Sequence, residues 1–201
     1  MKKGNVYTIV FIFLISAVFT TVLASVNAYF LPEIKINAEI ATKKSILKVL
    51  DIDISGSPAD IEKRYNESVF VRELKDYSVY KRIDKDKNVL GYATFYKGPG
   101  LWGDISGYIA VNNDLTKIMG IEFLSHSETP GLGGRIDEPW FKDQFKGIDI
   151  SKKQALSFKS GDKGEVDAIT GATTTSRAVL DLVNTTIKSK LQRLEDLKWP
   201  E

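Results

Sequence analysis

The chain has 201 residues, of which 43% are hydrophobic and 27% are charged, which suits one domain with a hydrophobic core and not a disordered chain. The 28 basic and 26 acidic side chains give a net charge of +2, so there is no overall basic field of the kind that attracts nucleic acid. Zero cysteines and a single histidine exclude disulfides, thiolate or multi-histidine metal sites and cysteine nucleophiles. Redox chemistry here therefore requires a bound cofactor.

The first predicted element is an uncharged apolar stretch near the N-terminus. Residues 6–31 carry no charge, and about 20 apolar residues in a helix span a bilayer core of about 30 Å. Lys2 and Lys3 precede the stretch, which predicts a cytoplasmic N-terminus and an extracytoplasmic remainder. The alternative is a signal peptide cleaved after residues 26–28. We favour a retained anchor over residues 1–32, because the stretch exceeds the roughly 7–15 apolar residues of a signal peptide.

Helices are predicted between this anchor and the first strands. Residues 33–50 place apolar side chains at helical spacing between charged ones, in good helix formers. Ser57 followed by Pro58 is typical of an N-cap and the first helical position. We expect residues 33–75 to form a linker and helical region.

Two β-hairpins are predicted next. Residues 77–80 and 89–96 are β-branched and aromatic runs on either side of a polar turn. Residues 105–111 and 117–124 flank a second turn, which reads Asn-Asn-Asp. These runs predict at least four antiparallel strands.

The remainder of the chain is predicted to be mainly helical. We expect a short amphipathic segment over residues 140–145, a strand near Val166 and a long helix from about residue 172 to 197. Helices at both ends of a run of strands indicate an α+β fold. One compact domain is expected over residues 76–201.

A glycine-rich loop follows the last predicted strand. Residues 125–135 read Ser-His-Ser-Glu-Thr-Pro-Gly-Leu-Gly-Gly-Arg, and the glycines permit positive φ angles and close backbone approach to a flat or anionic ligand. The loop does not match phosphate-binding fingerprints, because Ile136 stands where GxGxxG needs glycine and the P-loop lysine is missing. By composition, a ligand-binding loop and a tight turn with an incidental His126 fit equally well.

A second motif lies at the start of the long C-terminal helix. Residues 167–176 read Asp-Ala-Ile-Thr-Gly-Ala-Thr-Thr-Thr-Ser, with hydroxyl groups on half of them. The free N–H groups and the positive end of the dipole at a helix N-terminus stabilise a phosphate. The alternative, which composition alone favours, is plain N-capping by one serine or threonine.

Residues 167–173 resemble the flavinylation motif Asp-x-x-Ser/Thr-Gly-Ala-Thr, in which a dedicated flavin transferase joins FMN to the last threonine through a phosphoester. In this sequence the last threonine is Thr173. Residues 126–133 are similar to the His-x-Glu-Thr-Pro-Gly-Leu-Gly loop of the same FMN-binding domain family, and both motifs match at every fixed position. The resemblance implies an FMN site made of Thr173, as the covalent attachment point, with Asp167, Thr170, Gly171, Ala172, Glu128, Thr129, Gly131, Leu132 and Gly133.

The resemblance also implies how this site works. The phosphate would lie at the helix N-terminus, and the backbone of residues 128–133 would pack on the isoalloxazine ring. Asp167 is expected to serve recognition or metal binding during flavin transfer, and neither a separate catalytic residue nor a metal ligand is expected in the mature protein. Trp102, Tyr108 and Trp140 are candidates to stack on the ring, although such aromatic residues are more often part of the core.

Along nearly its whole length the chain is similar to two homologous membrane proteins. They are the C subunit of the Na+-translocating NADH:quinone oxidoreductase (Na+-NQR) and the G subunit of the Rnf ferredoxin:NAD oxidoreductase. The Gly-Leu-Trp block at residues 100–102 favours the first, and the short chain favours the second. The resemblance implies a membrane-anchored electron carrier in an ion-translocating complex, which does not turn over alone.

Its implied partners are other membrane and redox subunits, and its FMN domain is expected outside the cytoplasm, at the cell (inner) membrane. The alternatives are a stand-alone exported flavoprotein reductase and a flavin-free scaffold subunit.

Overall fold

The structure is a computed structural model. It describes the chain except for residues 1–2, 153, 161–163, 192 and 195–201. The chain divides into two compact units, Met1–Ile40 and Ala41–Glu201, and we describe each by itself.

The first unit consists of the larger part of helix α1 (Lys3–Val49) and contains the predicted apolar stretch. The side chains of residues 4–39 are exposed, and the helix is long and apolar enough to cross a membrane. Hydroxyl groups within it donate hydrogen bonds four residues back, from Thr21 to the Ala17 carbonyl (2.8 Å) and from Ser25 to the Thr21 carbonyl (2.7 Å). Polar groups in lipid must be satisfied inside the protein, so these bonds suit a membrane anchor.

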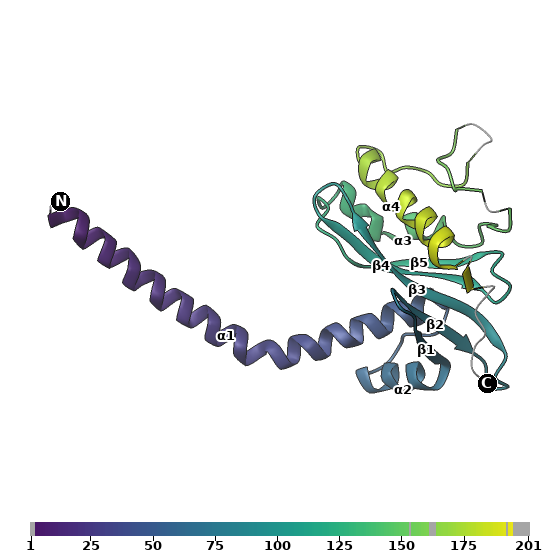
Figure 1. Ribbon diagram of the computed structural model, residues 1–201, viewed down its shortest axis with the longest axis horizontal. Helices are drawn as coiled ribbons and strands as arrows, with labels where there is room; N and C mark the ends of the chain where they lie inside the picture. Colours follow the sequence, from purple (N-terminus) through teal and green to yellow (C-terminus); the bar gives the residue numbers. More distant parts are fainter. Residues whose placement is uncertain (1–2, 153, 161–163, 192, 195–201) are drawn as a thin grey trace. The chain divides into compact units, whose positions relative to one another are not determined.

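A five-stranded antiparallel sheet forms the centre of the second unit (Figure 1). Its strands pair in sequence order: β1 (Val69–Glu73), β2 (Ser78–Ile83), β3 (Val89–Pro99), β4 (Asp104–Asn112) and β5 (Ile118–Ser125). The two predicted hairpins are β2–β3 and β4–β5. Together with the helices they confirm the α+β fold class.

Two strand predictions need correction. The sequence analysis missed β1, because this five-residue strand follows helix α2 (Pro58–Ser68) directly, without a turn to mark its start. The strand expected near Val166 is only a single parallel bridge to Phe158. The residues on either side of Val166 are exposed and acidic, so the apolar run is too short to form a ladder.

The predicted C-terminal helix is also shorter than expected. It is α4 (Thr173–Thr186), and the chain continues as a π-helical turn, η2 (Ile187–Leu191). Residue 192 and residues 195–197, where the helix was expected to continue and end, lie outside the described residues.

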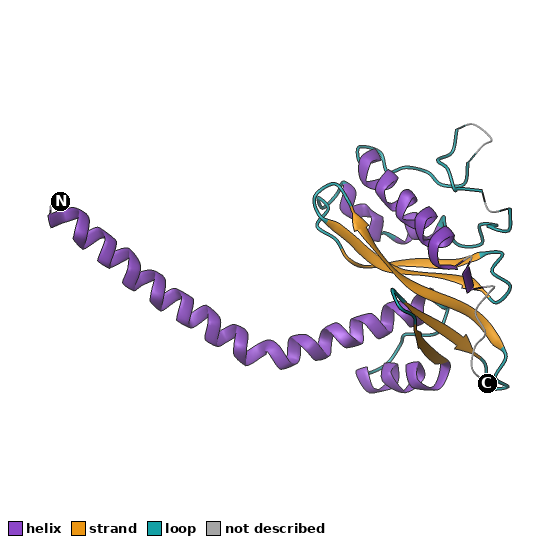
Figure 2. Cartoon of the chain, viewed as in Figure 1, coloured by secondary structure: helices purple, strands orange, loops and turns teal. Residues whose placement is uncertain are grey.

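Helices cover both faces of the sheet (Figure 2). One face is covered by η1 (Gly133–Asp137), α3 (Pro139–Asp143) and α4, and the other by α2 and the last turns of α1. Strand β4 is buried on both sides: Ile105 and Ile109 belong to the first core, and Tyr108 and Ala110 to the second. This alternation follows from the two-residue period of a strand.

Helix α2 begins where the sequence predicts. Ser57 is the N-cap, and its side chain accepts a hydrogen bond from the Asp60 N–H group while the Asp60 carboxylate accepts one from the Ser57 N–H group. Pro58 occupies the first turn, where its missing N–H group costs nothing.

Candidate functional site

The loop after β5 is held in place by the carboxylate of Glu128, which is only 4% exposed. Its Oε1 atom accepts hydrogen bonds from the backbone N–H groups of Leu101 (2.8 Å) and Trp102 (3.1 Å). Its Oε2 atom accepts a hydrogen bond from Thr175 Oγ1 (2.5 Å). One carboxylate therefore joins the loop, the β3–β4 turn and the first turn of α4.

These partners determine the charge of Glu128. Burial by itself would raise the pKa of the carboxyl group, but the hydrogen bonds from Thr175, Trp102 and Leu101 outweigh it, with His126 adding a smaller effect, and they hold the pKa below its usual value. The carboxylate is an anion whose oxygens face protein donors. These hydrogen bonds to the Glu128 carboxylate hold the glycine-rich loop against the β3–β4 turn and α4.

Gly133 allows the loop to close on this carboxylate. A Cβ atom at this position would lie 2.7 Å from both Glu128 Oε2 and Thr175 Oγ1, so a side chain cannot fit without displacing the contact. Gly131 has a φ angle of +74°, a conformation that favours glycine. The motif therefore requires glycine at these two positions for different reasons: lack of space at Gly133 and a positive φ angle at Gly131.

Helix α4 starts without a side-chain cap. Ala172 is its N-cap residue, and Ser176 donates the first helical hydrogen bond, to the Ala172 carbonyl (3.0 Å). Among the described residues, the N–H groups of Thr173, Thr174 and Thr175 have no acceptor. Plain N-capping by a serine or threonine is therefore not what the structure shows. Three N–H groups at the positive end of the helix dipole are available to an anion.

The hydroxyl groups around the start of α4 differ in accessibility. Thr175 and Ser176 are each 1% exposed, and their hydroxyl groups are hydrogen-bonded within the protein. Thr170, Thr173 and Thr174 are exposed, and their hydroxyl groups make no hydrogen bond within the described part of the chain. Only these three can carry a large substituent without displacing the core.

The two motifs meet at Leu132 and Gly171. The Thr129 carbonyl accepts a hydrogen bond from the Leu132 N–H group (3.1 Å), and this turn leaves the Leu132 side chain 48% exposed. Gly171 has a φ angle of +79°, and a Cβ atom there would lie 3.4 Å from Leu132 Cδ2. The loop and the residues before α4 therefore form one continuous surface.

The three aromatic candidates are placed differently. Trp102 is 68% exposed, beside the Glu128 contact. Trp140 is partly exposed, and the Arg135 guanidinium lies 5.4 Å from the centre of its ring. Tyr108 is buried in the core between Tyr80 and Phe95, so it cannot stack on a ligand.

Asp167 is fixed through its backbone, and its carboxylate lies on the surface. The Gln144 side chain accepts a hydrogen bond from the Asp167 N–H group (2.7 Å) and donates one to its carbonyl (3.4 Å). The carboxylate pairs with Lys159 (2.8 Å), and both side chains of this pair are about half exposed. A second protein can therefore reach the Asp167 carboxylate.

His126 has a structural role at the start of the loop. Its Nδ1 atom accepts a hydrogen bond from the Glu128 N–H group (3.2 Å), and its Nε2 atom lies 2.9 Å from Asp137 Oδ2. A ring nitrogen that accepts a hydrogen bond carries no proton, so in the neutral ring the proton is on Nε2. The histidine is thus held by partners on both sides.

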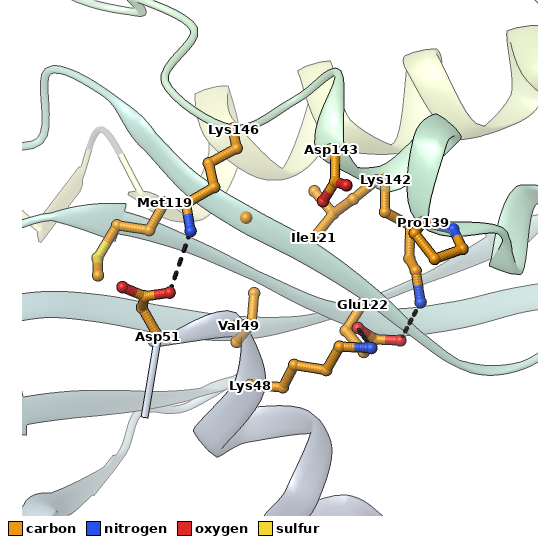
Figure 3. A pocket seen from close by; sticks show the side chains of 11 residues that line it. Lys48, Val49, Asp51, Met119, Ile121, Glu122, Pro139, Lys142, Asp143 and Lys146 are labelled. Carbon is orange, nitrogen blue, oxygen red and sulfur yellow. Dashed lines mark hydrogen bonds and ion pairs between the residues drawn. The ribbon is translucent and has the colours of Figure 1, made fainter. Parts of the chain in front are cut away.

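A separate cavity of about 250 Å³ lies between the last turn of α1, β5 and α3 (Figure 3). Glu122 in this cavity pairs with Lys48 (2.8 Å) and Lys142 (2.5 Å), and Asp51 pairs with Lys146 (3.0 Å). None of the residues of the two motifs lines this cavity. It is therefore distinct from the surface at the start of α4.

Comparison with known families gives a match over the part of the chain that holds both motifs. Residues 100–188 match the FMN-binding domain family. The matched range includes the β3–β4 turn, the glycine-rich loop and α4.

Curated relatives match a similar share of the chain. The G subunit of an ion-translocating oxidoreductase complex from Methanosarcina acetivorans is 38% identical over 108 residues, which is 54% of this chain and 55% of that protein. The C subunit of the Na(+)-translocating NADH-quinone reductase from Pseudomonas aeruginosa is 33% identical over 125 residues, which is 57% of this chain and 48% of that protein. The chain spans about half the length of these relatives.

Solved structures share the fold. NqrC from Shewanella oneidensis superposes with a TM-score of 0.66 at 21% identity, covering 77% of this chain and 96% of that chain. The C subunit of the Na(+)-translocating NADH-quinone reductase from Parabacteroides distasonis gives 0.69 at 26% identity, covering 82% and 96%.

Proposed function

We propose that this chain carries FMN on Thr173 through a phosphoester, because residues 100–188 match the FMN-binding domain family. The observation that carries the proposal is the accessibility of the Thr173 hydroxyl group. Its hydroxyl group is exposed and without a partner among the described residues, at the start of α4 and at the last position of the motif. The hydroxyl groups of the buried neighbours Thr175 and Ser176 are instead hydrogen-bonded to Glu128 and to the Ile169 N–H group.

The residues around Thr173 suit the parts of FMN. The unpaired N–H groups of the first turn of α4 are hydrogen-bond donors for a phosphate. The exposed side chains of Leu101, Trp102 and Leu132 offer apolar surface to a flat ring. Bound FMN would supply one- and two-electron chemistry, which the side chains of this chain do not provide.

We propose that the protein is an electron-carrier subunit of an ion-translocating oxidoreductase complex. The curated matches include subunits of both the Rnf and the Na+-NQR kind, so we propose membership of an ion-translocating oxidoreductase complex and do not choose between the two kinds. The partners would be other membrane and redox subunits, and a flavin transferase during maturation. The apolar part of α1 would anchor the protein in the membrane, with Lys2 and Lys3 in the cytoplasm and the FMN domain outside it.

The test is the attachment of flavin to variants of the start of α4. The full chain is expressed with and without a flavin transferase, and flavin is measured by in-gel fluorescence under denaturing conditions and by intact mass. Thr173→Ala should lose the covalent flavin completely, whereas Thr173→Ser keeps a hydroxyl group and should retain part of it. Thr174→Ala is the matched control, since its hydroxyl group is equally exposed and unpartnered, and it should keep the flavin.

Each alternative function predicts a different result. A flavin-free scaffold subunit would show no fluorescence even with the transferase present. A stand-alone reductase would carry flavin but would not copurify with integral membrane partners in mild detergent. Fluorescence that persists in Thr173→Ala and disappears in Thr174→Ala would contradict the assignment of the attachment residue.

A further inference from the structure

We propose that Arg177 binds the phosphate of the FMN attached to Thr173, from a groove beside α4. This inference rests on the proposed covalent attachment. It adds a cationic phosphate ligand that lies outside both sequence motifs.

Arg177 is one helical turn after Thr173. Residues four apart in a helix lie on the same face, with Cβ atoms about 5–6 Å apart. Long side chains in a helix lean toward its N-terminus, so they cover the turn before their own Cα atom. The Arg177 side chain therefore belongs to the surface above the turn that begins at Thr173.

The guanidinium group of Arg177 is free to take a ligand. The residue is exposed, and within the described residues it forms no ion pair and no hydrogen bond. Three other arginines show the contrast: Arg64, Arg82 and Arg135 each donate to a carboxylate or a backbone carbonyl. An unpaired arginine next to the proposed phosphate position therefore has no competing partner in this part of the chain.

A groove of about 530 Å³ opens beside Arg177. Thr174 and Arg177 line it from α4, and Gly98 and Gly100 line it from the end of β3 and the turn after it. The lining of the groove thus includes Arg177 and Thr174, the residue that follows Thr173. Because Thr173 is exposed and its neighbour Thr174 lines the groove, we infer that a substituent on the Thr173 hydroxyl group enters it.

The other charged residues that line the groove are less suited than Arg177 to bind the phosphate. The Lys97 ammonium is paired with Asp104 (3.0 Å), so its charge is already compensated. Asp181 also lines the groove and would repel a phosphate, but it lies one further turn from Thr173, beyond Arg177. Arg177 is therefore the nearest uncompensated charge on this face of α4.

The chemistry of the phosphate fits a guanidinium group. A phosphodiester keeps one negative charge at neutral pH, and the planar fork of arginine donates two parallel hydrogen bonds to two of its oxygens. The N–H groups at the start of α4 and Arg177 would hold the phosphate from two directions. Because the phosphoester alone is a flexible tether, this second contact would fix the direction in which the flavin leaves Thr173.

The test compares the full chain in detergent, with and without attached flavin, in four forms: wild type, Arg177→Met, Arg177→Lys and Lys188→Met. Lys188 is the matched control, because its substitution removes the same charge from an exposed position in η2, 11 residues further along the chain. The measurements are the rise in unfolding temperature that flavin attachment causes, the ³¹P resonance of the phosphodiester and the fluorescence anisotropy of the flavin.

We expect Arg177→Met to lose at least half of that rise, to shift the ³¹P resonance and to lower the anisotropy. Arg177→Lys should recover part of each effect, and Lys188→Met should match the wild type. If Arg177→Met takes up no flavin, recovery of attachment in Arg177→Lys supports the inference and failure to recover overturns it. An equal drop in unfolding temperature with and without flavin would show a merely structural role and would also overturn it.

Failure of this inference is distinguishable from failure of the proposed function. If wild type and Arg177→Met carry flavin with the same temperature rise and the same ³¹P resonance, Arg177 is not a phosphate ligand and the proposed function stands. If the wild type never acquires flavin in the presence of the transferase, both proposals fall.

Discussion

At the scale of single residues, Glu128 connects most of the site. Two backbone donors of the β3–β4 turn and one hydroxyl group of α4 converge on its carboxylate, and Gly133 makes room for that contact. A buried anion with these donors stabilises the fold more than a neutral group of the same shape, because hydrogen bonds to charged groups are the stronger ones. This difference depends on pH.

Glu128→Gln should reduce the free energy of unfolding by about 1–2 kcal/mol at neutral pH. The pKa of Glu128 is below its ordinary value of 4.5 in the folded protein, so the stabilising effect of the carboxylate is complete above pH 4.5 and is lost as the pH falls through the folded value. Urea unfolding of both proteins at neutral pH and below the folded pKa should show the difference shrinking toward zero. A difference that stays constant with pH would contradict this account.

The roles of the hydroxyl-bearing residues show what the sequence predicts of the site. The motif predicts that Thr173 is the attachment residue, and this stays a prediction, although the residue is exposed in the structure. The structural roles of Thr175 and Ser176 were missed, although the pattern contains a signal: they lie four and three residues before buried Val179, on the apolar stripe of α4. The contact of Glu128 with the β3–β4 turn could not be predicted, because it joins residues 26 and 27 positions apart.

At the scale of elements, the sequence predicts those with a strong local pattern. Four of the five strands and the start of α2 follow from alternation, turns and capping residues. β1 lacks a turn before it, and it is specified mainly by its pairing with β2, from Val69 opposite Arg82 to Glu73 opposite Ser78. Such pairing depends on tertiary context, which a local pattern does not contain.

The ion pairs of Glu122 join three elements and predict a large effect of one substitution. Glu122 on β5 pairs with Lys142 of α3, and the side chains of both are 11% exposed. Glu122→Gln would leave two lysines together, one of them largely buried, and should reduce the free energy of unfolding by about 3 kcal/mol. Asp51→Asn removes an exposed pair with Lys146 and should cost less than about 1 kcal/mol. Equal effects of the two substitutions in urea unfolding would contradict the importance of burial here.

At the scale of the whole molecule, helix α1 belongs to both compact units. Its apolar N-terminal part is exposed throughout, whereas Ile46, Leu47, Val49 and Leu50 near its C-terminal end are 0–2% exposed in the core beneath the sheet. If a flexible linker joined the anchor to the second unit, the core of that unit would contain no side chains from the anchor helix. Here the continuous helix contributes side chains to the fold of the second unit.

This division predicts opposite results for two truncations that differ by ten residues. A chain of residues 41–201 keeps all four buried side chains, so it should fold and stay soluble without detergent, whereas the full chain should require detergent. A chain of residues 51–201 loses them, at about 1.5–3 kcal/mol each, which is comparable to the whole stability of a typical domain of about 5–15 kcal/mol. It should aggregate, or unfold at a clearly lower temperature in circular dichroism melting. Equal melting temperatures for the two chains would show that these residues are not part of the core, and insolubility of residues 41–201 would show that the second unit does not fold independently.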